Sequence, residues 1–535
     1  MSNHFLPRLC PFLLLLGLTA CGGGGGGGAA APLTTQTAQP GVTFALTDAP
    51  SDELGVLNVE LTRVALVDAS GSTLQVFPGP GGGRLPANLL KLRGVSKLLA
   101  HLSLPPGDYT QLQLDYVGAT ATDRAGNALS VSPASGAARS DFVPALTVTG
   151  ANQLVEIDFD VDASVSNLVP GAGGSLTLDP TLLLEVKTQG AGYAIEDFHG
   201  IVATTYANGL DVQVPGGVVR VAVGAGTVIA GPSGLTTGPQ GLAGIAAGAE
   251  VEVHGSYDIA AGSVSAVAIE LEDGLRGMRG PEAQGIVLSL GATDFELLVL
   301  ERRDAAFPVG SVQRIATDGA TRFAYDGYPG VAASFANLAP GQEVRVFGVP
   351  NVASGVKLRD TRVAGTVSAL GGGSVTLDVT SFERVAVTGR TSLPTQIQVA
   401  LGSGAPALSQ GARVELEGQF NRTAPGVFDL SAAQTSLQAQ EDQIEGTVFR
   451  VVASSPLTVE LTGNAGALGN PLTLSVLVTG QTTVVERNTQ TGVVTAISAA
   501  DLAAGIQAGR YVELRAKGQA NGVTLTATSI RADYR

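Results

Sequence analysis

The sequence predicts an all-β protein that is divided into several small domains. Glycine makes up 72 of the 535 residues, whereas charged residues account for 14% and aromatic residues for 5%. Short runs in which apolar and polar residues alternate recur along the chain, and this period of two is typical of half-buried strands. A glycine pattern also recurs about every 80 residues. A chain of this length therefore forms several tandem domains of short strands joined by glycine turns.

The first twenty residues have the pattern of an export signal. Arg8 is followed by the apolar run Leu9–Leu18, which is far shorter than the roughly 20 apolar residues that span a bilayer. Leu18-Thr19-Ala20-Cys21 follows directly and resembles the bacterial lipobox. The resemblance implies that residues 1–20 are removed as a lipoprotein signal peptide, and that diacylglycerol and palmitate-type acyl chains on Cys21 provide a membrane anchor. The alternative is an ordinary signal peptide cut at an Ala-x-Ala-like site.

Residues 21–40 are predicted to form a flexible tether. Gly22–Gly28 is an unbroken glycine run, and such a segment buries too little apolar surface to fold. No Asp follows Cys21, which in a Gram-negative cell resembles lipoproteins sent to the outer membrane. The sequence thus predicts a cell-envelope protein outside the cytoplasmic membrane, in the outer membrane or at the cell surface, with the membrane as a partner through Cys21.

The net charge and the cysteine content predict which partners and cross-links the chain lacks. The formal net charge is −15 and tryptophan is absent, so the chain lacks the basic grooves and stacking rings of nucleic-acid-binding proteins. Cys10 leaves with the signal peptide and Cys21 carries lipid. The sequence therefore predicts no nucleic-acid partner and a body without disulfides.

Residues 41–190 are expected to form one β-sandwich domain. Residues 42–46, 57–66 and 110–116 alternate as strands do, and residues 89–102 are leucine-rich, which favours a short helix. The domain resembles the family known as domain of unknown function 4382, and this resemblance implies a prealbumin-like sandwich and no known activity. The segments that carry the resemblance are Leu46-Thr47-Asp48-Ala49-Pro50, Leu104-Pro105-Pro106-Gly107-Asp108-Tyr109, Ile157-Asp158-Phe159-Asp160 with Ser164, and Leu178-Asp179-Pro180.

The remainder is predicted to be four tandem barrels, at residues 195–275, 282–362, 363–441 and 442–535. A strand-opening Gly-x-Val recurs at Gly200, Gly285, Gly365 and Gly446. Each unit reads as three strands, a short helix-like patch such as 242–247 or 499–506, and two strands, which resembles a small OB-like barrel. The repeats also resemble domain of unknown function 5666. Glycines at strand starts are expected to allow the positive φ of turns and bulges.

One strand carries a candidate cation site. Glu156, Asp158, Asp160 and Asp162 alternate with apolar residues, so a single strand would present all four carboxylates on one face. Calcium takes clustered oxygen ligands of this kind, and Asp48 and Asp52 are candidate helpers. The alternative is a solvated outer face. Apart from this calcium hypothesis, the sequence predicts no cofactor.

Three common catalytic and nucleotide-binding motifs are missing from the sequence. No nucleophile elbow, Walker loop or dinucleotide fingerprint is present. His101, His199 and His254 show no ligand spacing, and His254 is expected at the surface because Phe347 and Glu417 occupy its place in sister repeats. We therefore predict a non-enzymatic binding or scaffolding protein whose partner is an envelope polymer or a surface protein. The alternatives are an enzyme or accessory subunit acting on envelope polysaccharide, and a structural spacer.

Overall fold

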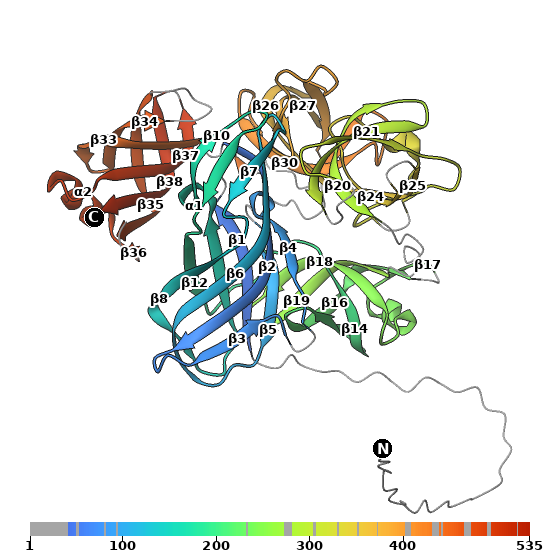
Figure 1. Cartoon of the computed structure of the whole chain (residues 1–535), viewed down its shortest axis with the longest axis horizontal. Helices are drawn as coiled ribbons and strands as arrows, with labels where there is room; N and C mark the ends of the chain where they lie inside the picture. Colours follow the sequence, from blue (N-terminus) through green and yellow to red (C-terminus); the bar gives the residue numbers. More distant parts are fainter. Residues whose placement is uncertain are drawn as a thin grey trace, which may run out of the picture.

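The computed structural model is all-β, as predicted. It describes residues 41–49, 53–79, 82–92, 95–231, 234–271, 281–302, 307–328, 331–349, 352–371, 373–401, 408–430, 438–439, 442–464, 472–488, 494–521 and 523–534. The predicted signal peptide, Cys21, the tether and Asp52 lie outside the described residues. Figure 1 shows a sandwich (blue to teal) with four smaller barrels around it (green, yellow, orange and red).

The N-terminal domain is a two-sheet sandwich. One sheet is four-stranded with the order β12-β9-β1-β5, and the other is eight-stranded with the path β10-β11-β7-β6-β2-β3, with β4 on β2 and β8 on β6. The core between the sheets is built from alternate residues of facing strands, such as Phe44, Leu112 and Phe159. The strands are β1 (Val42–Ala49), β2 (Leu54–Asp68), β3 (Thr73–Phe77), β4 (Leu85–Asn88), β5 (Lys97–Leu102), β6 (Gly107–Asp123), β7 (Ala128–Ser132), β8 (Gly136–Val148), β9 (Gln153–Asp160), β10 (Val165–Val169), β11 (Ser175–Leu178) and β12 (Leu182–Lys187).

The short helix expected within residues 89–102 is only a single 3-10 turn. That segment forms the 3-10 turn η1 (Leu89–Lys91) and then the edge strand β5. Leu98, Leu99 and Ala100 are all buried, because the two faces of β5 pack against different neighbours. A leucine-rich strand that is covered on both faces cannot be told from a buried helix by periodicity alone.

Four barrels follow, and each repeats the predicted order of strands. Barrel 1 closes through β14-β15-β16-β19-β18, and barrel 2 through β20-β21-β22-β25-β24. Barrels 3 and 4 close through the β26–β30 and β34–β35 pairings. Closure removes exposed strand edges, which suits a chain of small β domains.

The bounds of the barrel strands complete the fold. In barrel 1 they are β13 (Tyr193–Ala194), β14 (Phe198–Tyr206), β15 (Gly209–Val214), β16 (Gly217–Gly231), β17 (Gly234–Thr237), β18 (Glu250–Asp258) and β19 (Ser263–Leu271). In barrel 2 they are β20 (Glu282–Leu290), β21 (Asp294–Arg302), β22 (Val312–Ala316), β23 (Arg322–Tyr325), β24 (Glu343–Val349) and β25 (Val352–Leu358). In barrel 3 they are β26 (Thr361–Gly371), β27 (Ser374–Phe382), β28 (Val385–Ala386), β29 (Gln396–Ala400), β30 (Arg413–Phe420), β31 (Val427–Leu430) and β32 (Gln438–Ala439). In barrel 4 they are β33 (Asp442–Ser454), β34 (Leu457–Asn464), β35 (Leu472–Asn488), β36 (Val494–Ala496), β37 (Glu513–Asn521) and β38 (Thr524–Tyr534).

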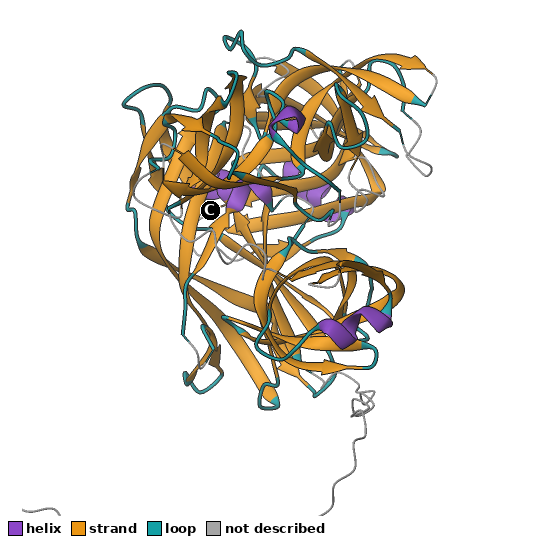
Figure 2. Cartoon of the chain, turned by 90° about the vertical axis from the view of Figure 1, so that its right-hand side faces the viewer, coloured by secondary structure: helices purple, strands orange, loops and turns teal. Residues whose placement is uncertain are grey.

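The helix-like patches lie where the repeat pattern places them. They are η2 (Pro239–Gly244) in barrel 1, η4 (Phe335–Asn337) in barrel 2 and α2 (Ala499–Gln507) in barrel 4. Ser498 caps α2 by accepting a hydrogen bond from the Asp501 N–H, and the Asp501 carboxylate accepts one from the Ser498 N–H. Figure 2 shows how short these helices are beside the strands.

Glycine recurs in the Gly-x-Val pattern for a different reason from the one expected. Their φ values are not positive; the strand backbones approach too closely for a side chain. A Cβ at Gly285 would lie 2.0 Å from the Leu298 carbonyl oxygen, and one at Gly446 would lie 2.1 Å from that of Thr462. The pairing register shifts at or beside Gly285, Gly365 and Gly446, so these three glycines mark bulges where the first barrel strand bends.

The sandwich is the hub on which the barrels dock. The buried residues Ala45, Leu98 and Leu154 of the sandwich belong to the core cluster of barrel 1. Val56 belongs to the cluster that spans barrels 2 and 3. On the other side, Asp160 binds Arg531 of barrel 4, 371 residues along the chain. The domains therefore form one compact arrangement rather than an extended string.

Candidate functional site

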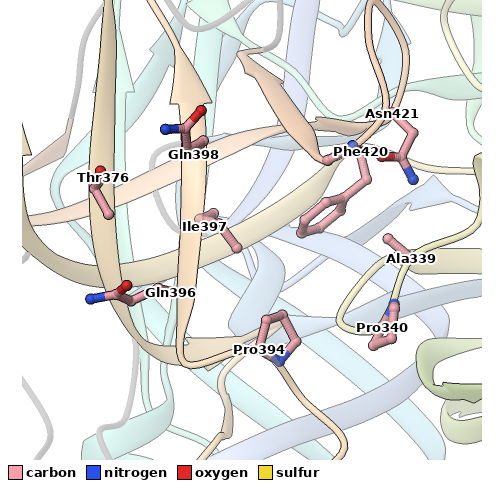
Figure 3. Close-up of a pocket in the computed structure, with 10 residues that line it drawn as sticks. Ala339, Pro340, Thr376, Pro394, Gln396, Ile397, Gln398, Phe420 and Asn421 are labelled. Carbon is pink, nitrogen blue, oxygen red and sulfur yellow. Dashed lines mark hydrogen bonds between the residues drawn. The ribbon is translucent and has the colours of Figure 1, made fainter. Parts of the chain in front are cut away.

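A groove between barrels 2 and 3 is an opening large enough for a small ligand. Its volume is about 530 Å³, which lies within the range of small-molecule sites. Figure 3 shows the polar side chains of β27 and β29 on one side and a loop of barrel 2 on the other. The groove is lined by Ala339, Pro340, Thr376, Pro394, Gln396, Ile397, Gln398, Phe420, Asn421 and Gly426.

The polar wall follows from strand alternation. Thr376 of β27 faces Gln398 of β29, and Gln396 lies two residues before Gln398 on the same outer face. Both glutamines are exposed, whereas the intervening Ile397 is buried in the barrel core. Gln396 donates a hydrogen bond of 2.7 Å to Asp378 Oδ1, which fixes its amide. The wall therefore offers amide donors and acceptors at regular spacing.

The floor and the opposite wall are held rigidly. Phe420 packs edge-on against Phe428, with ring centroids 4.9 Å apart. Asn421 adopts φ +54, donates its amide to the Asn337 carbonyl at 3.0 Å, and accepts the Gly426 N–H at 2.7 Å. The Tyr325 hydroxyl of barrel 2 donates to the Asn421 carbonyl at 2.9 Å. These contacts join the two barrels at the groove, so its shape is set before a ligand arrives.

None of the ten lining residues is charged. The amide and hydroxyl groups can exchange hydrogen bonds with hydroxyls or amides of a ligand, and the proline and phenylalanine rings offer apolar faces. This chemistry fits a neutral, hydroxyl-rich ligand better than an ion.

A second cluster of chemical groups is buried between barrels 1 and 2, and we refer to it as the charged joint. Lys357, only 2% exposed, binds Glu252 Oε2 and lies 3.0 Å from Asp326 Oδ1. Arg359 lies 3.2 Å from Asp197 and 2.8 Å from Asp326. The charged joint comprises Asp197, His199, Glu252, His254 and Glu270 of barrel 1, and Glu282, Asp326, Arg345, Lys357 and Arg359 of barrel 2.

Electrostatics in the charged joint are strong because its groups are desolvated. Burial opposes ionisation of Glu252, but Lys357 outweighs it and holds the pKa of that carboxyl below its ordinary value. Burial raises the pKa of Glu270 to about 7. Burial also lowers the pKa of His254, but the Glu252 and Asp197 carboxylates outweigh it and raise that pKa overall. The surface position predicted for His254 is wrong, because its Nε2 atom is buried in this joint.

The carboxylates of the predicted acidic strand have different roles in the structure. Glu156 binds Lys187 of the neighbouring strand β12. The strand ends at Asp160, whose carboxylate accepts the Ala163 N–H at 2.9 Å and caps α1 (Val161–Ser164). Asp162 therefore lies on a helical turn, and the prediction that one strand face carries all four carboxylates is wrong.

The positive charges beside Asp160 and Asp162 come from barrel 4. Arg531 binds Asp160, and Arg515 Nη1 lies 3.4 Å from Asp162 Oδ2. Asp158 lies near Asp48, the helper proposed from the sequence. The strand thus forms part of a joint between the sandwich and barrel 4, and calcium binding by Glu156, Asp158, Asp160 and Asp162 stays a prediction.

Asp48 is the group in this region that most opposes folding. Its carboxylate is buried, and neither oxygen has a hydrogen-bond partner within the described residues. Burial and the nearby Asp158 raise the pKa of Asp48 well above its ordinary value. Because the folded state holds this proton more tightly, stability falls as pH rises from the unfolded pKa towards the folded one.

We therefore expect Asp48→Asn to stabilise the protein at pH 7, because the amide needs neither a bound proton nor a desolvated negative charge. The gain should shrink towards pH 3, where the wild-type carboxyl is mostly protonated in both states. Thermal unfolding of both proteins across this pH range measures the difference. A gain that is the same at both ends would contradict this origin.

Sequence reasoning missed both sites for identifiable reasons. The groove arises only when barrel 2 meets barrel 3, and Gln396 and Gln398 look like any exposed strand residues. The charged joint did leave a signal: Asp197-x-His199 and Glu252-x-His254 are spaced by two, the spacing that puts side chains on one strand face. The two segments are far apart in sequence, so only the pairing of β14 with β18 brings them together.

Comparisons with known proteins match the domains. Residues 40–180 match the family model described as Domain of unknown function (DUF4382), and residues 199–270 and 445–531 match Domain of unknown function (DUF5666). No curated protein matches the chain. A solved structure, drosophila Unr CSD456, is similar at 14% identity over 46% of this chain and 97% of that chain, but its TM-score of 0.12 supports no argument. Among the described residues, no helix combines the length and apolarity needed to cross a membrane. The sequence resemblances to these two domain families are therefore confirmed over residues 40–180, 199–270 and 445–531.

Proposed function

We propose that this chain is a lipid-anchored protein of the bacterial cell envelope that binds a neutral envelope polysaccharide in the groove between barrels 2 and 3, without acting on it chemically. The observation that carries the proposal is the preformed, uncharged groove with two glutamines along one wall. The lipobox-like Leu18-Thr19-Ala20-Cys21 supports the anchor, and residues 21–40 would let the body stand away from the lipid.

The position of the groove in its barrel supports the same function. It lies over the second and third strands of barrel 3, β27 and β29, and beside the turn that joins β30 to β31. This is the face on which OB-type barrels bind oligosaccharides and oligonucleotides. That analogy concerns the fold alone, and the net charge of −15 favours a neutral glycan over a polyanion.

The placement of acidic side chains favours binding over hydrolysis. Glycosidases need two carboxyl groups flanking the scissile bond. In the described residues, the clustered carboxylates of Asp197, Glu252 and Asp326 lie in the charged joint beside lysine and arginine side chains rather than in the groove. A groove that binds without acid–base groups fits an envelope-binding protein.

The binding test is co-sedimentation with isolated envelope polymers. The protein is residues 22–535, which omit only Cys21 and what precedes it and retain every described residue. We expect retention by a neutral polysaccharide but not by an anionic one. Gln396→Ala combined with Gln398→Ala should weaken retention about tenfold, since each lost hydrogen bond contributes about 0.5–1.5 kcal/mol.

A matched control is the pair Gln111→Ala and Gln113→Ala on β6 of the sandwich. These glutamines have the same spacing on one strand, away from the groove. The control should bind like the wild type. Equal losses in both double variants would place the binding site elsewhere, and no retention by any polymer would leave a spacer or a protein scaffold as the better function.

A further inference from the structure

On one face of barrel 1, the charged joint contains two histidines and two carboxylates, which form two cross-strand pairs. In the antiparallel pairing of β14 with β18, His199 lies opposite Glu252. Phe198 lies opposite Val253, so Asp197 and His254 occupy the neighbouring rung on the same face. Two imidazoles and two carboxylates thus lie on adjacent rungs, as metal ligands do in many β-sheet sites.

Two overlapping groups of ligand atoms are each compact enough to hold one ion. One atom each from Asp197, His199 and Glu252 lies within 4.8 Å of the others, and the same holds for Glu252, His254 and Asp326. Glu252 belongs to both groups, so it lies between the two histidines. His199 Nε2 is 3.2 Å from Glu252 Oε1.

Two buried atoms face this space without a hydrogen bond. Glu252 has a fully buried side chain, and its Oε1 atom, 3.2 Å from His199 Nε2, makes no hydrogen bond of good geometry within the described parts of the chain. His254 Nε2 also makes no hydrogen bond there. A buried polar atom without a partner is costly, and both are atoms that coordinate metal ions.

The surrounding charges leave room for a divalent cation. Five acidic side chains (Asp197, Glu252, Glu270, Glu282 and Asp326) meet three basic ones (Arg345, Lys357 and Arg359), an excess of two acidic groups that protons or a divalent cation can balance. Lys357 binds the other oxygen of Glu252, Oε2, and Arg359 binds Asp197. These contacts resemble the outer hydrogen bonds that orient metal-binding carboxylates.

We propose that the charged joint is a site for a divalent transition-metal ion of the Zn²⁺ class, bound by His199, Glu252 and His254 with Asp197 as the fourth ligand. Imidazole ligands favour such ions over calcium or magnesium, which prefer oxygen alone. The side chain of His199 is 28% exposed, so the site is reached from that edge. The ion would join the two strands beneath barrel 2 and stabilise the contact between barrels 1 and 2.

The test uses residues 22–535 without a histidine tag, because that chain has no cysteine and only three histidines. After chelator treatment, titration calorimetry with Zn²⁺ should show one ion per chain, and Zn²⁺ should raise the melting temperature. Co²⁺ should give the visible absorption bands of a four-coordinate site. His199→Gln, Glu252→Gln and His254→Gln should each weaken binding at least about 100-fold, since losing even an outer partner costs about 10–100-fold.

His101→Gln is the matched control, because His101 hydrogen-bonds Thr43 in the sandwich and lies outside the joint. It should keep full binding. Melting of each variant in chelator shows that it is folded, so lost binding is not mistaken for lost structure. Binding that survives both His199→Gln and His254→Gln overturns the proposal. The proposal is also overturned if neither Zn²⁺ nor Co²⁺ binds to the protein. Protons would then neutralise the excess negative charge of the joint.

Discussion

Lys357→Met is expected to destabilise barrels 1 and 2 by about 3–5 kcal/mol, the usual cost of removing one partner from a buried ion pair. Lys357 lies between Glu252 and Asp326, whose side chains are 0% and 5% exposed. Methionine fills much of the same volume but leaves Glu252 without its nearest cation and leaves Asp326 paired with Arg359. For about 160 residues, such a loss lowers the melting temperature by roughly 6–20 °C.

Differential scanning calorimetry in the presence of chelator measures this effect, because five domains need not melt as one unit. Arg450→Met is the matched control: Arg450 also binds a carboxylate, that of Glu460 at 2.7 Å, but its side chain is 70% exposed. Solvent screens that pair, so no measurable change is expected. Adding Glu252→Gln to Lys357→Met should recover part of the lost stability, since the buried Glu252 carboxylate is replaced by a neutral amide. Equal melting of Lys357→Met and wild type would show that the joint is not closed in solution.

The fold could be predicted from the sequence because its determinants are local. Alternation in residues 42–46 and 110–116, and the order of strands and helix-like patches in each repeat, depend on neighbouring residues. The errors came from contacts between distant parts. Leucines of β5 mimic a helix because barrel 1 covers the outer face of that strand. Asp160 ends its strand because its own side chain caps α1.

The functional surfaces depend on which faces of the repeats meet. His254 was expected to be exposed because its counterparts in sister repeats are Phe347 and Glu417, but the barrels share a fold without sharing neighbours. Barrel 2 covers the outer face of β18 and adds Lys357, 105 residues away from Glu252 in sequence. Comparison among repeats reports on the common core, whereas the joints use the outer faces that differ from one repeat to the next.

Arg531→Met is expected to detach barrel 4 from the sandwich at neutral pH. Arg531 binds Asp160, which is 3% exposed, and Asp160 is also the cap of α1. Removing the arginine leaves a buried carboxylate without its closest cation, again at a cost of about 3–5 kcal/mol. Among the described residues, the core cluster of barrel 4 contains no residue of the sandwich, whereas that of barrel 1 contains three, so we expect this loss to exceed what holds the two domains together.

The pH dependence identifies the cause. Burial raises the pKa of Asp160, but Arg531 and Arg515 outweigh it and hold that pKa below its ordinary value of 3.8. A carboxyl with a lowered folded pKa contributes stability that is complete above the unfolded pKa and is lost as pH falls through the folded one. The difference between wild type and Arg531→Met should therefore be full at pH 7 and shrink below about pH 4. Asp160→Asn retains a capping side chain and should remove the difference, because asparagine needs no counter-ion.

Limited proteolysis and calorimetry distinguish detachment from unfolding. If barrel 4 only detaches, its own melting transition persists in Arg531→Met, while the segment before β33 becomes the first site of cleavage. If the ion pair instead stabilises barrel 4 itself, its transition shifts downwards and its strands are cleaved. A variant with unchanged melting and cleavage at pH 7 would show that the apolar contacts of the sandwich suffice to hold barrel 4 in place.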